Sequence, residues 1–424
     1  MNTDKNSLIE KSRQYVQAIL NGDFDSLAAN LSGELASQMN ASLLKQSWNS
    51  AIKELPACQG ILSEDYKEVQ GMNIVSVVLD YTTSGLRLMF GFDQDGKISR
   101  LGVNYVPHPT TQIEIKQSDK FSETPIKIGG PQYPLDGKLT MPKETGDVPV
   151  VILVHGSGSH DMNETIGSAG NAVFADLAYG LAERGIASIR YNKRYYQHPE
   201  TATPTLTVWD EVINDVNAAM ALARTTDGID KNKLFVIGHS LGGVLTPEIA
   251  KENADIAGFV SLAGSARNLE DIILDQNKAA IKAMNTTDDE KQAILDKVLD
   301  LVKQVKALTP ESPHCSIFNM NNEYWLSLKE TNPYSIVATL TIPMLFLQGS
   351  ADFQVTPDAD FALWQKLLQG HTNAQFKLYP GLNHLFMKSN GKADVTEYNT
   401  KGHVEEQVIA DISEWIAKPG VSLL

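Results

Sequence analysis

Cysteine is scarce in this chain, whose 424 residues include two, Cys58 and Cys315. They lie far apart and lack the C-x-x-C spacing, so a disulfide framework and a structural zinc site are both disfavoured. We therefore expect two free thiols and a reducing compartment, because disulfides persist mainly in oxidising ones.

Long apolar runs are missing as well. The longest, such as Val150–Val154, end after five or six residues, whereas a membrane-spanning helix needs about 20. The first twenty residues contain no apolar block of signal-peptide length. These absences predict a cytoplasmic protein without a membrane span, although a chain whose leader had been removed would look the same.

Positive charge is also in short supply. There are 36 lysines and arginines against 51 aspartates and glutamates, which gives a net charge of -15, and the longest basic cluster is Lys193–Arg194. A polyanion would be repelled, so we expect no nucleic-acid partner. The composition, 42% hydrophobic and 21% charged, is that of an ordinary globular protein. At roughly 100–200 residues per domain, the chain is long enough for two or three domains.

Residues 1–107 have the pattern of a small α+β domain. The capping-box sequence Ser7-x-x-Glu10 predicts the start of one helix, and apolar residues at helical spacing predict another near residues 43–52. Three segments rich in β-branched and aromatic residues predict an antiparallel meander: 72–81, 84–93 and 97–106. Helices followed by a meander indicate a helix layer packed on a sheet. Residues 108–120, with Pro109 and a polar run, predict a linker.

From residue 121 to 424 the pattern alternates between strand and helix. Apolar strands are expected at 150–154, 186–191, 234–237, 258–263, 343–348 and 375–379. The alternation predicts an α/β fold with a doubly wound, mostly parallel sheet, in which ligands bind at the carboxyl ends of the strands. Residues 267–338 interrupt it with an amphipathic helix that Thr287-x-x-Glu290 caps. We expect this insertion to be a helical cap over the site; the alternative is a helical ornament elsewhere on the surface.

The strongest chemical signal is Gly238-His239-Ser240-Leu241-Gly242. It matches G-x-S-x-G and lies between a predicted strand and a predicted helix, the context in which this motif lifts a nucleophilic serine above a sheet. The glycines are needed because the turn is sharp, and the helix N-terminus favours negative charge at the serine. We therefore predict that Ser240 is a nucleophile.

A serine nucleophile needs a base, and the base needs an orienting acid. His384 follows the strand at 375–379 and Asp352 follows the strand at 343–348, so Ser240, Asp352 and His384 occur in the chain order expected for this motif. We predict His384 as the base and Asp352 as the acid. The alternatives are His371 for the base and Asp358 or Asp360 for the acid.

A tetrahedral intermediate also needs an oxyanion hole. One donor is expected to be the backbone N–H of Leu241, directly after the nucleophile. The other is expected from the loop His155-Gly156-Ser157-Gly158, where glycines allow close approach of the backbone, and we assign it to the N–H of Ser157. Lys193 and Arg194 also follow a strand end, and we expect their charges in structural ion pairs.

Several motifs occur together in this chain: His155-Gly156-Ser157-Gly158 with Asp161, Glu164 and Thr165, Arg190-Tyr191-Asn192-Lys193-Arg194, Gly238-His239-Ser240-Leu241-Gly242-Gly243, Gln348-Gly349-Ser350-Ala351-Asp352 and Asn383-His384. With them, residues 121–420 resemble an α/β-hydrolase of the dienelactone-hydrolase-related branch of bacterial serine esterases. The resemblance implies ester hydrolysis with Ser240 as nucleophile, His384 as base and Asp352 as acid. Dienelactone hydrolases proper use a cysteine, so Ser240 favours esterase activity. Residues 1–107 resemble a cystatin-like α+β domain often joined to such hydrolases.

The predicted function is that of a serine carboxylesterase that hydrolyses small esters through an acyl-enzyme, with no metal or organic cofactor. Three alternatives stay open: a serine peptidase or amidase with the same triad, an acyl-CoA thioesterase, and a catalytically silent binding protein on a hydrolase fold. Four side chains of the insertion are expected either to line an acyl or aryl pocket or to pack the cap against the sheet: Ile317, Phe318, Tyr324 and Trp325.

The first 107 residues offer no constellation for chemistry, so we expect a role in assembly, substrate delivery or partner binding. In segment 72–81, Val75 and Val77 alternate with Ile74 and Val78, so both faces of the sheet carry apolar residues. A sheet face in contact with water is usually polar. We therefore expect the second face to be covered by the hydrolase domain, or by another copy of the chain in a homodimer.

Overall fold

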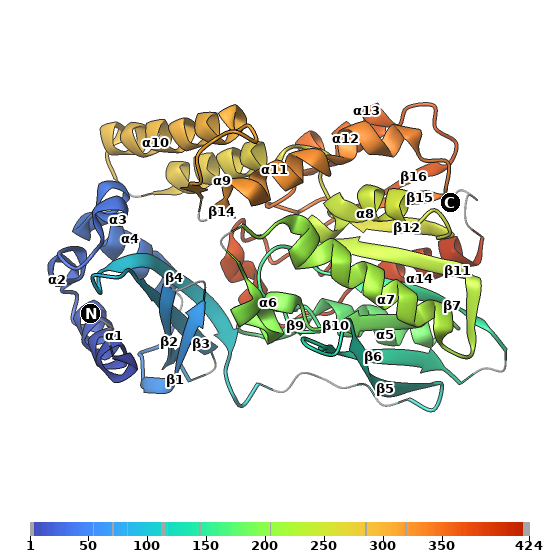
Figure 1. The fold of residues 1–424 in the computed structure, drawn as a ribbon, viewed down its shortest axis with the longest axis horizontal. Coiled ribbons are helices and arrows are strands. Elements are labelled where there is room, and N and C mark those ends of the chain that lie inside the picture. The colour runs from blue at the N-terminus through green and yellow to red at the C-terminus, as the bar shows by residue number, and fades with distance from the viewer. Residues whose placement is uncertain are drawn as a thin grey trace.

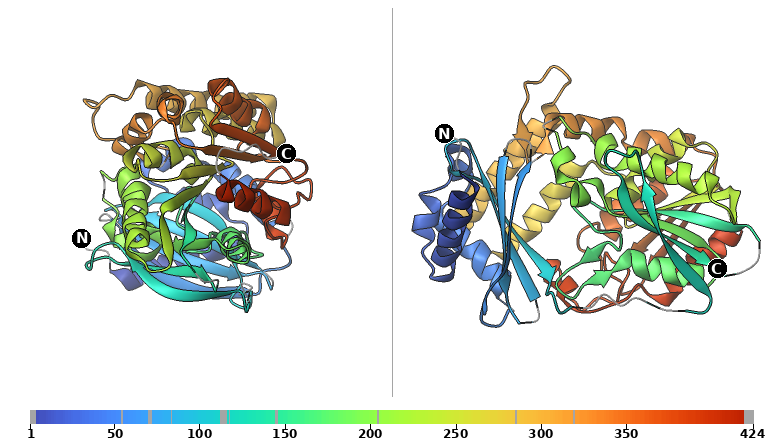
Figure 2. Two further views of the ribbon diagram at one scale, coloured as in Figure 1. Left: turned by 90° about the vertical axis from the view of Figure 1, so that its right-hand side faces the viewer. Right: turned by 60° about the horizontal axis from the view of Figure 1, so that its bottom comes forward.

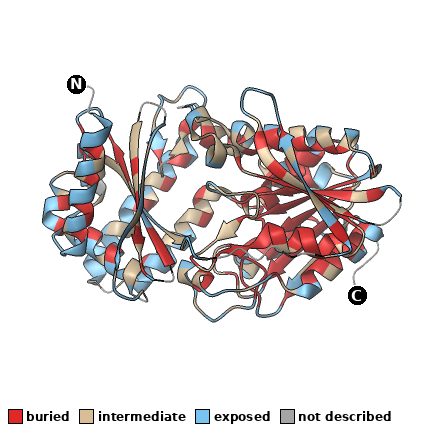
Figure 3. Ribbon diagram, turned by 90° about the horizontal axis from the view of Figure 1, so that it is seen from below, coloured by how far each residue is buried: buried red, intermediate tan, exposed pale blue. Residues whose placement is uncertain are grey.

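The computed structural model describes residues 4–53, 55–69, 72–82, 84–111, 116, 118–143, 146–203, 205–284, 286–318 and 320–418. Figure 1 shows an N-terminal unit (residues 4–107) beside a larger C-terminal unit (residues 121–418). Buried residues concentrate in the central sheet of the C-terminal unit and between the sheet and helices of the N-terminal unit (Figure 3). No helix within the described ranges is both long and apolar enough to cross a membrane.

The N-terminal unit packs a helix layer on one antiparallel sheet. Its helices are α1 (Lys5–Leu20), α2 (Phe24–Ala28), α3 (Gly33–Gln38) and α4 (Ala41–Ile52). Its sheet has the order β1 (Gly60–Val69), β2 (Met72–Asp80), β3 (Ser84–Phe92) and β4 (Ile98–Pro107). Two expectations need correction. Helix α1 begins at Lys5 with Asp4 as its N-cap, so Ser7 lies inside the helix, and β1 adds a fourth strand to the meander.

The two faces of this sheet have different surroundings. Val75, Val77 and Leu79 are fully buried against the helices. The alternate residues of β2, among them Ile74 and Val78, are half-buried and face the C-terminal unit, which lies on the other side of the sheet (Figure 2). Of the two expected covers for this face, the structure provides the C-terminal unit of the same chain.

The C-terminal unit is built on an eight-stranded sheet. In sheet order the strands are β16 (Ala374–Tyr379), β15 (Met344–Gly349), β12 (Gly258–Leu262), β11 (Ile229–His239), β7 (Val148–Val154), β10 (Ala187–Tyr191), β6 (Leu135–Pro142) and β5 (Phe121–Ile128). The six strands from β16 to β10 are parallel, and β6 and β5 continue the sheet with antiparallel pairing. The predicted doubly wound, mostly parallel sheet is confirmed.

Helices cover both faces of this sheet. One face packs on α5 (Val173–Ala182) and α14 (Glu406–Ala417), and the other packs on α7 (Asn214–Thr225), α8 (Leu241–Glu252) and α13 (Ala362–Leu367). The remaining short elements are β8 (Thr165–Ile166), β9 (Asn171–Ala172), α6 (Arg194–Gln197), the π-helical turns Trp209–Ile213 and Pro357–Phe361, and the 3₁₀ turns Pro199–Thr201, Val337–Thr339 and Val395–Asn399.

The insertion between β12 and β15 is helical, as predicted. It contains α9 (Leu269–Ala283), α10 (Asp288–Ala307), α11 (Asn322–Glu330) and α12 (Pro333–Ile336). The capping box of Thr287 and Glu290 is present at the start of α10. A two-stranded ribbon, β13 (Ser316–Ile317) with β14 (Met320–Asn321), was not expected. Figure 1 shows α9 and α10 extending from the C-terminal unit over the N-terminal unit.

Candidate active site

Ser240 lies on a strained turn between β11 and α8. Its backbone has φ 52° and ψ -117°, a left-handed conformation that non-glycine residues rarely adopt. Its N–H donates to the Leu262 carbonyl at 2.8 Å, which ties the turn to β12. A Cβ on Gly242 would overlap the carbonyl oxygen of Val154, and a Cβ on Gly238 would overlap that of Gly242. Both glycines of the motif are therefore required by close backbone approach.

His384 and Asp352 form a buried pair after β16 and β15. His384 Nδ1 lies 2.7 Å from Asp352 Oδ2, and both residues are nearly inaccessible. Asp352 is itself held in place: its Oδ2 accepts from Gln348 Nε2 at 2.8 Å, and its Oδ1 accepts the N–H groups of Gln354 and Val355 at 2.8 and 3.0 Å. Such a pair orients the ring with Nε2 as the nitrogen left for chemistry.

The alternative acids and base lie elsewhere. Asp360 is buried against other partners, because it accepts from the Ser265 hydroxyl at 2.6 Å and lies 3.5 Å from Arg267. Asp358 is exposed in the turn before α13. His371 lies before β16 and is not among the residues that line the cavity of Ser240. Asp352 is thus the carboxylate that the fold brings to His384.

The loop after β7 is held on both sides at Gly156. The Gly156 N–H donates to Glu164 Oε1 at 2.7 Å, and the Gly156 carbonyl accepts from the ammonium of Lys193 at 2.7 Å. Lys193 is only 3% exposed and also pairs with Glu211 Oε1 at 2.6 Å. In a trans peptide the carbonyl and the following N–H point in opposite directions. Lys193 therefore turns the Ser157 N–H to the opposite side of the loop.

This loop lies directly against the predicted nucleophile. A Cβ added to Gly156 would come within 3.1 Å of Ser240 Cβ. Lys193 forms the structural ion pair that the sequence predicts. Its hydrogen bond to the loop is not predicted by the sequence. The partner of that pair, Glu211, gave no signal in the sequence beyond its place in a helix.

A second buried ion pair joins the loop to the turn of Ser240. His239 Nδ1 lies 3.0 Å from Glu164 Oε2, and His239 Nε2 donates to the His384 carbonyl at 3.0 Å. Burial alone would lower the pKa of His239, but the Glu164 carboxylate outweighs it and the pKa is raised. Burial would likewise raise the pKa of Glu164, but His239 lowers it to about 2. Each partner therefore favours the charged form of the other, and the pair links the Gly156 loop to the His384 backbone.

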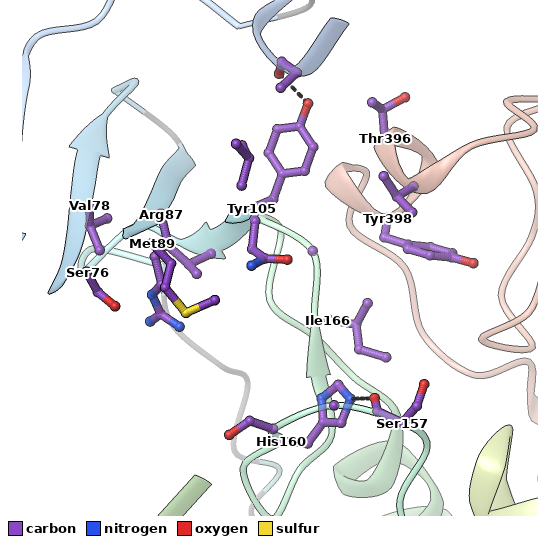
Figure 4. A pocket seen from close by; sticks show the side chains of 18 of the residues that line it. Ser76, Val78, Arg87, Met89, Tyr105, Ser157, His160, Ile166, Thr396 and Tyr398 are labelled. Atoms are coloured by element: carbon purple, nitrogen blue, oxygen red, sulfur yellow. Dashed lines mark hydrogen bonds between the residues drawn. The ribbon is translucent and has the colours of Figure 1, made fainter. Parts of the chain in front are cut away.

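Ser240 and His384 open into one cavity of about 2340 Å³ between the two units. From the C-terminal unit its walls include residues 156–161 and 164–167, and from the insertion they include the end of α9. From the N-terminal unit they include α4 and all four strands. Figure 4 shows side chains of β2 to β4 on one side of this space and those of Ser157, His160 and Ile166 on another.

The four side chains expected at a substrate pocket lie outside these walls. Ile317, Tyr324 and Trp325 are buried, and Phe318 packs edge-on against Trp325 with ring centroids 6.3 Å apart. Trp325 Nε1 donates to the Ile317 carbonyl at 3.0 Å, and the Tyr324 hydroxyl donates to Glu211 at 2.5 Å. Their hydrophobic surface fills the interior of the insertion and its contact with the sheet, which is the packing alternative. In the described part of the chain, no group of three or more His, Cys, Asp or Glu side chains is placed to hold a metal ion.

Comparisons with known proteins give several matches. Among solved structures, Est1E from Butyrivibrio proteoclasticus is 17% identical with a TM-score of 0.45, covering 70% of this chain and 98% of that one. A putative dienelactone hydrolase from Klebsiella pneumoniae is 18% identical with a TM-score of 0.41, covering 70% and 99%. Residues 12–101 match a family described as a protein of unknown function, DUF3887.

Two further matches are more extensive. Residues 148–390 match the family described as serine aminopeptidase, S33. Esterase EstD from Thermotoga maritima is 33% identical over 413 residues, which cover 95% of this chain and 94% of that protein. The chain therefore belongs to the serine aminopeptidase S33 family of α/β-hydrolases, and its sequence is similar to that of an esterase over nearly its whole length.

Proposed function

We propose that this protein is a serine carboxylesterase that hydrolyses small carboxylic esters through an acyl-enzyme. The observation that supports this most is that Ser240, on its strained turn, and His384, which is bonded to Asp352, line the same cavity. The esterase related along 95% of the chain supports the same reaction class.

In the proposed reaction His384 works through Nε2, because its Nδ1 is bonded to Asp352. Nε2 accepts the proton of the Ser240 hydroxyl as Oγ attacks the ester carbonyl. The imidazolium then protonates the departing alcohol, which leaves the acyl group on Ser240. A water that gives its proton to the same nitrogen attacks this acyl group. The imidazolium then returns the proton to Ser240 Oγ as the bond to the acyl carbon breaks and the acid leaves. Asp352 keeps the ring oriented and stabilises the imidazolium.

Two backbone N–H groups are the proposed oxyanion donors. Leu241 is the first residue of α8, so its N–H has no carbonyl partner within the helix. The Ser157 N–H points away from Lys193, because Lys193 holds the carbonyl of the same peptide at 2.7 Å. Both donors are fixed before substrate binds, which is the arrangement that stabilises a developing negative charge most effectively.

Aminopeptidase or amidase activity is the second candidate, favoured by the description of the matching family. Cleavage of a substrate with a free amino group would need a carboxylate near the nucleophile to receive the ammonium. The two carboxylates of the neighbouring loop are already bonded within the protein. Glu164 pairs with His239 and accepts from Gly156, and Asp161 accepts the N–H and hydroxyl of Thr165 at 2.9 Å each. Because both carboxylates already have partners within the protein, an ester is favoured over a substrate with a free amino group.

A pair of chromogenic substrates tests the proposal. The full-length protein should hydrolyse p-nitrophenyl butyrate with a higher kcat/KM than alanine or leucine p-nitroanilide. Ser240→Ala should lose ester hydrolysis by several orders of magnitude, because the members of such a triad act as a unit. Faster turnover of the anilide would make the second candidate the function. Retention of more than about a tenth of the ester activity in Ser240→Ala would place the nucleophile elsewhere.

A further inference from the structure

The outer face of the N-terminal sheet is a wall of the cavity that contains Ser240. Strand register places one set of side chains on this face, because Asp65 pairs with Ser76, Val78 pairs with Arg87, and Arg87 pairs with Asn104. All of the following outer-face residues line the cavity: Ser63, Asp65, Lys67, Ile74, Ser76, Val78, Arg87, Met89, Asn104 and Val106. The N-terminal unit therefore presents much of one sheet face to the cavity that contains Ser240.

Arg87 is the arginine of this face that lines the cavity. Its neighbours across the sheet are Val78 and Asn104, and Met89 follows it on the same face of β3. Arg87 is an exposed residue, and no described carboxylate lies within ion-pair distance of its guanidinium. The diagonal carboxylate, Asp80, accepts the Thr82 N–H at 2.6 Å and lies 3.6 Å from His108.

Arg87 also faces the reactive side of the cavity. Burial and the Asp161 carboxylate raise the pKa of Tyr196, and the Arg87 charge opposes that rise, so Arg87 lies within electrostatic range of the Tyr196 hydroxyl. Tyr196 and Asp161 both line the cavity. Asp161 lies in segment 156–161, which also contains Ser157. Figure 4 shows Arg87 and Met89 between the sheet and this segment.

The charge of the wall contrasts with that of the chain. The whole protein carries a net charge of -15. Among described residues, the cavity wall of the N-terminal unit has four cationic side chains (Lys45, Lys53, Lys67 and Arg87) and a single carboxylate, Asp65. An anionic small molecule is therefore attracted to this wall and repelled by most of the remaining surface. The planar guanidinium matches a carboxylate in a two-point contact, which a lysine cannot make.

We propose that the outer face of the N-terminal sheet is a substrate subsite, in which Arg87 binds a carboxylate carried by the ester remote from its scissile bond. Ile74, Val78, Met89 and Val106 then contact the apolar part between the two groups. The favoured substrates are monoesters of dicarboxylic acids or similar esters with one free carboxylate. This inference rests on the proposed function, because it assigns the substrate of the Ser240 site.

The test compares two series of substrates on the full-length protein. One series contains mono-p-nitrophenyl esters of dicarboxylic acids of increasing length, and the other contains the neutral acyl esters of matching length. The wild type should prefer the carboxylated ester for at least one chain length. Arg87→Gln should raise KM for that ester by about tenfold to a hundredfold, the range expected for one charged hydrogen-bonded contact. Its kinetics on the neutral ester should stay within twofold.

Arg100→Gln is the matched control. Arg100 lies on the same face of the same sheet, opposite Gly91, but outside the cavity. It should leave both substrate series unchanged. The subsite is refuted if the wild type prefers no carboxylated ester, or if Arg87→Gln affects both series equally or neither.

A binding measurement separates this inference from the proposed function. Calorimetry with the Ser240→Ala variant should show binding of the preferred carboxylated ester, weakened about tenfold or more by adding Arg87→Gln. If Ser240→Ala still hydrolyses the esters, the proposed nucleophile fails while the binding result stands. Loss of the Arg87 dependence in the binding data would overturn the subsite alone.

Discussion

Lys193→Met removes one charge from beneath the Gly156 loop with little change in side-chain length. The ammonium is 3% exposed and bonds both the Gly156 carbonyl and Glu211, at 2.7 and 2.6 Å. Without it the Ser157 N–H is no longer fixed in direction. Complete loss of an oxyanion donor costs about 10²–10³ in kcat. Because the proposed donor, the Ser157 N–H, is loosened rather than removed, we expect kcat to fall by about tenfold to a hundredfold, with KM nearly unchanged.

The same variant should also lose stability, and the two effects can be separated. Glu211 would be left as an unpaired, largely buried carboxylate, which typically costs about 3–5 kcal/mol. The double variant Lys193→Met with Glu211→Gln should recover most of the free energy of unfolding, measured in urea, but not kcat. The interpretation is refuted if kcat recovers together with stability, or if the single variant keeps kcat within twofold.

Arg194→Met provides the control at the neighbouring position. Arg194 donates to the buried Asp215 at 3.1 Å but has no bond to the Gly156 loop. Its loss should therefore destabilise the fold by a similar mechanism while leaving kcat on a small ester within about twofold.

Two further predictions concern the other buried pairs. Asp352→Asn should lower kcat by about 10⁴ while the protein remains folded, because an amide does not hold His384 in the tautomer whose Nε2 can accept a proton. Unchanged kinetics with p-nitrophenyl butyrate would contradict this. His239 has a raised pKa, so its contribution to stability is complete below its ordinary value of 6.5 and is lost as pH rises through the raised value. Glu164 has its pKa lowered to about 2, so its contribution is complete above 4.5 and is lost as pH falls toward 2. Urea midpoints should thus separate wild type from Glu164→Gln most between about pH 4.5 and 6.5, whereas parallel curves across pH would refute the ion pair.

The parts that the sequence predicted are those encoded locally. Gly238 and Gly242 are required by contacts made within one turn, so the motif and its strand-turn-helix context suffice to place Ser240. Buried parallel strands such as β7 are continuous apolar runs and were recognised as such. The chain order of Asp352 and His384 follows from the order of the strands, and the structure brings the two together at 2.7 Å.

The parts that it did not predict depend on contacts between distant segments. Strand β1 reads Gly-Ile-Leu-Ser-Glu-Asp-Tyr-Lys-Glu-Val and is an edge strand with mostly polar side chains, so its sequence carries little hydrophobic signal. Lys193 and Gly156 are 37 residues apart, and the sequence around neither residue predicts their hydrogen bond. The apolar residues Tyr324 and Trp325 looked equally suited to a pocket or to packing, because periodicity identifies a buried side chain without saying what buries it.

The cavity itself was the least predictable feature. Alternation in β2 showed that both faces of the N-terminal sheet carry apolar residues, and this implied a cover. Which surface provides the cover depends on how the two units lie against each other. That arrangement is what places Arg87 in the same cavity as Ser240, and no pattern within either segment encodes it.

Covalent labelling of the nucleophile tests the central claim most directly. The full-length protein, treated with a fluorophosphonate and digested, should yield one modified peptide, with the adduct on Ser240. Ser240→Ala should remain unmodified while showing the same urea unfolding transition as the wild type. An adduct on a different serine, or no adduct on a protein that is folded and hydrolyses p-nitrophenyl butyrate, would contradict the proposal that Ser240 attacks the ester.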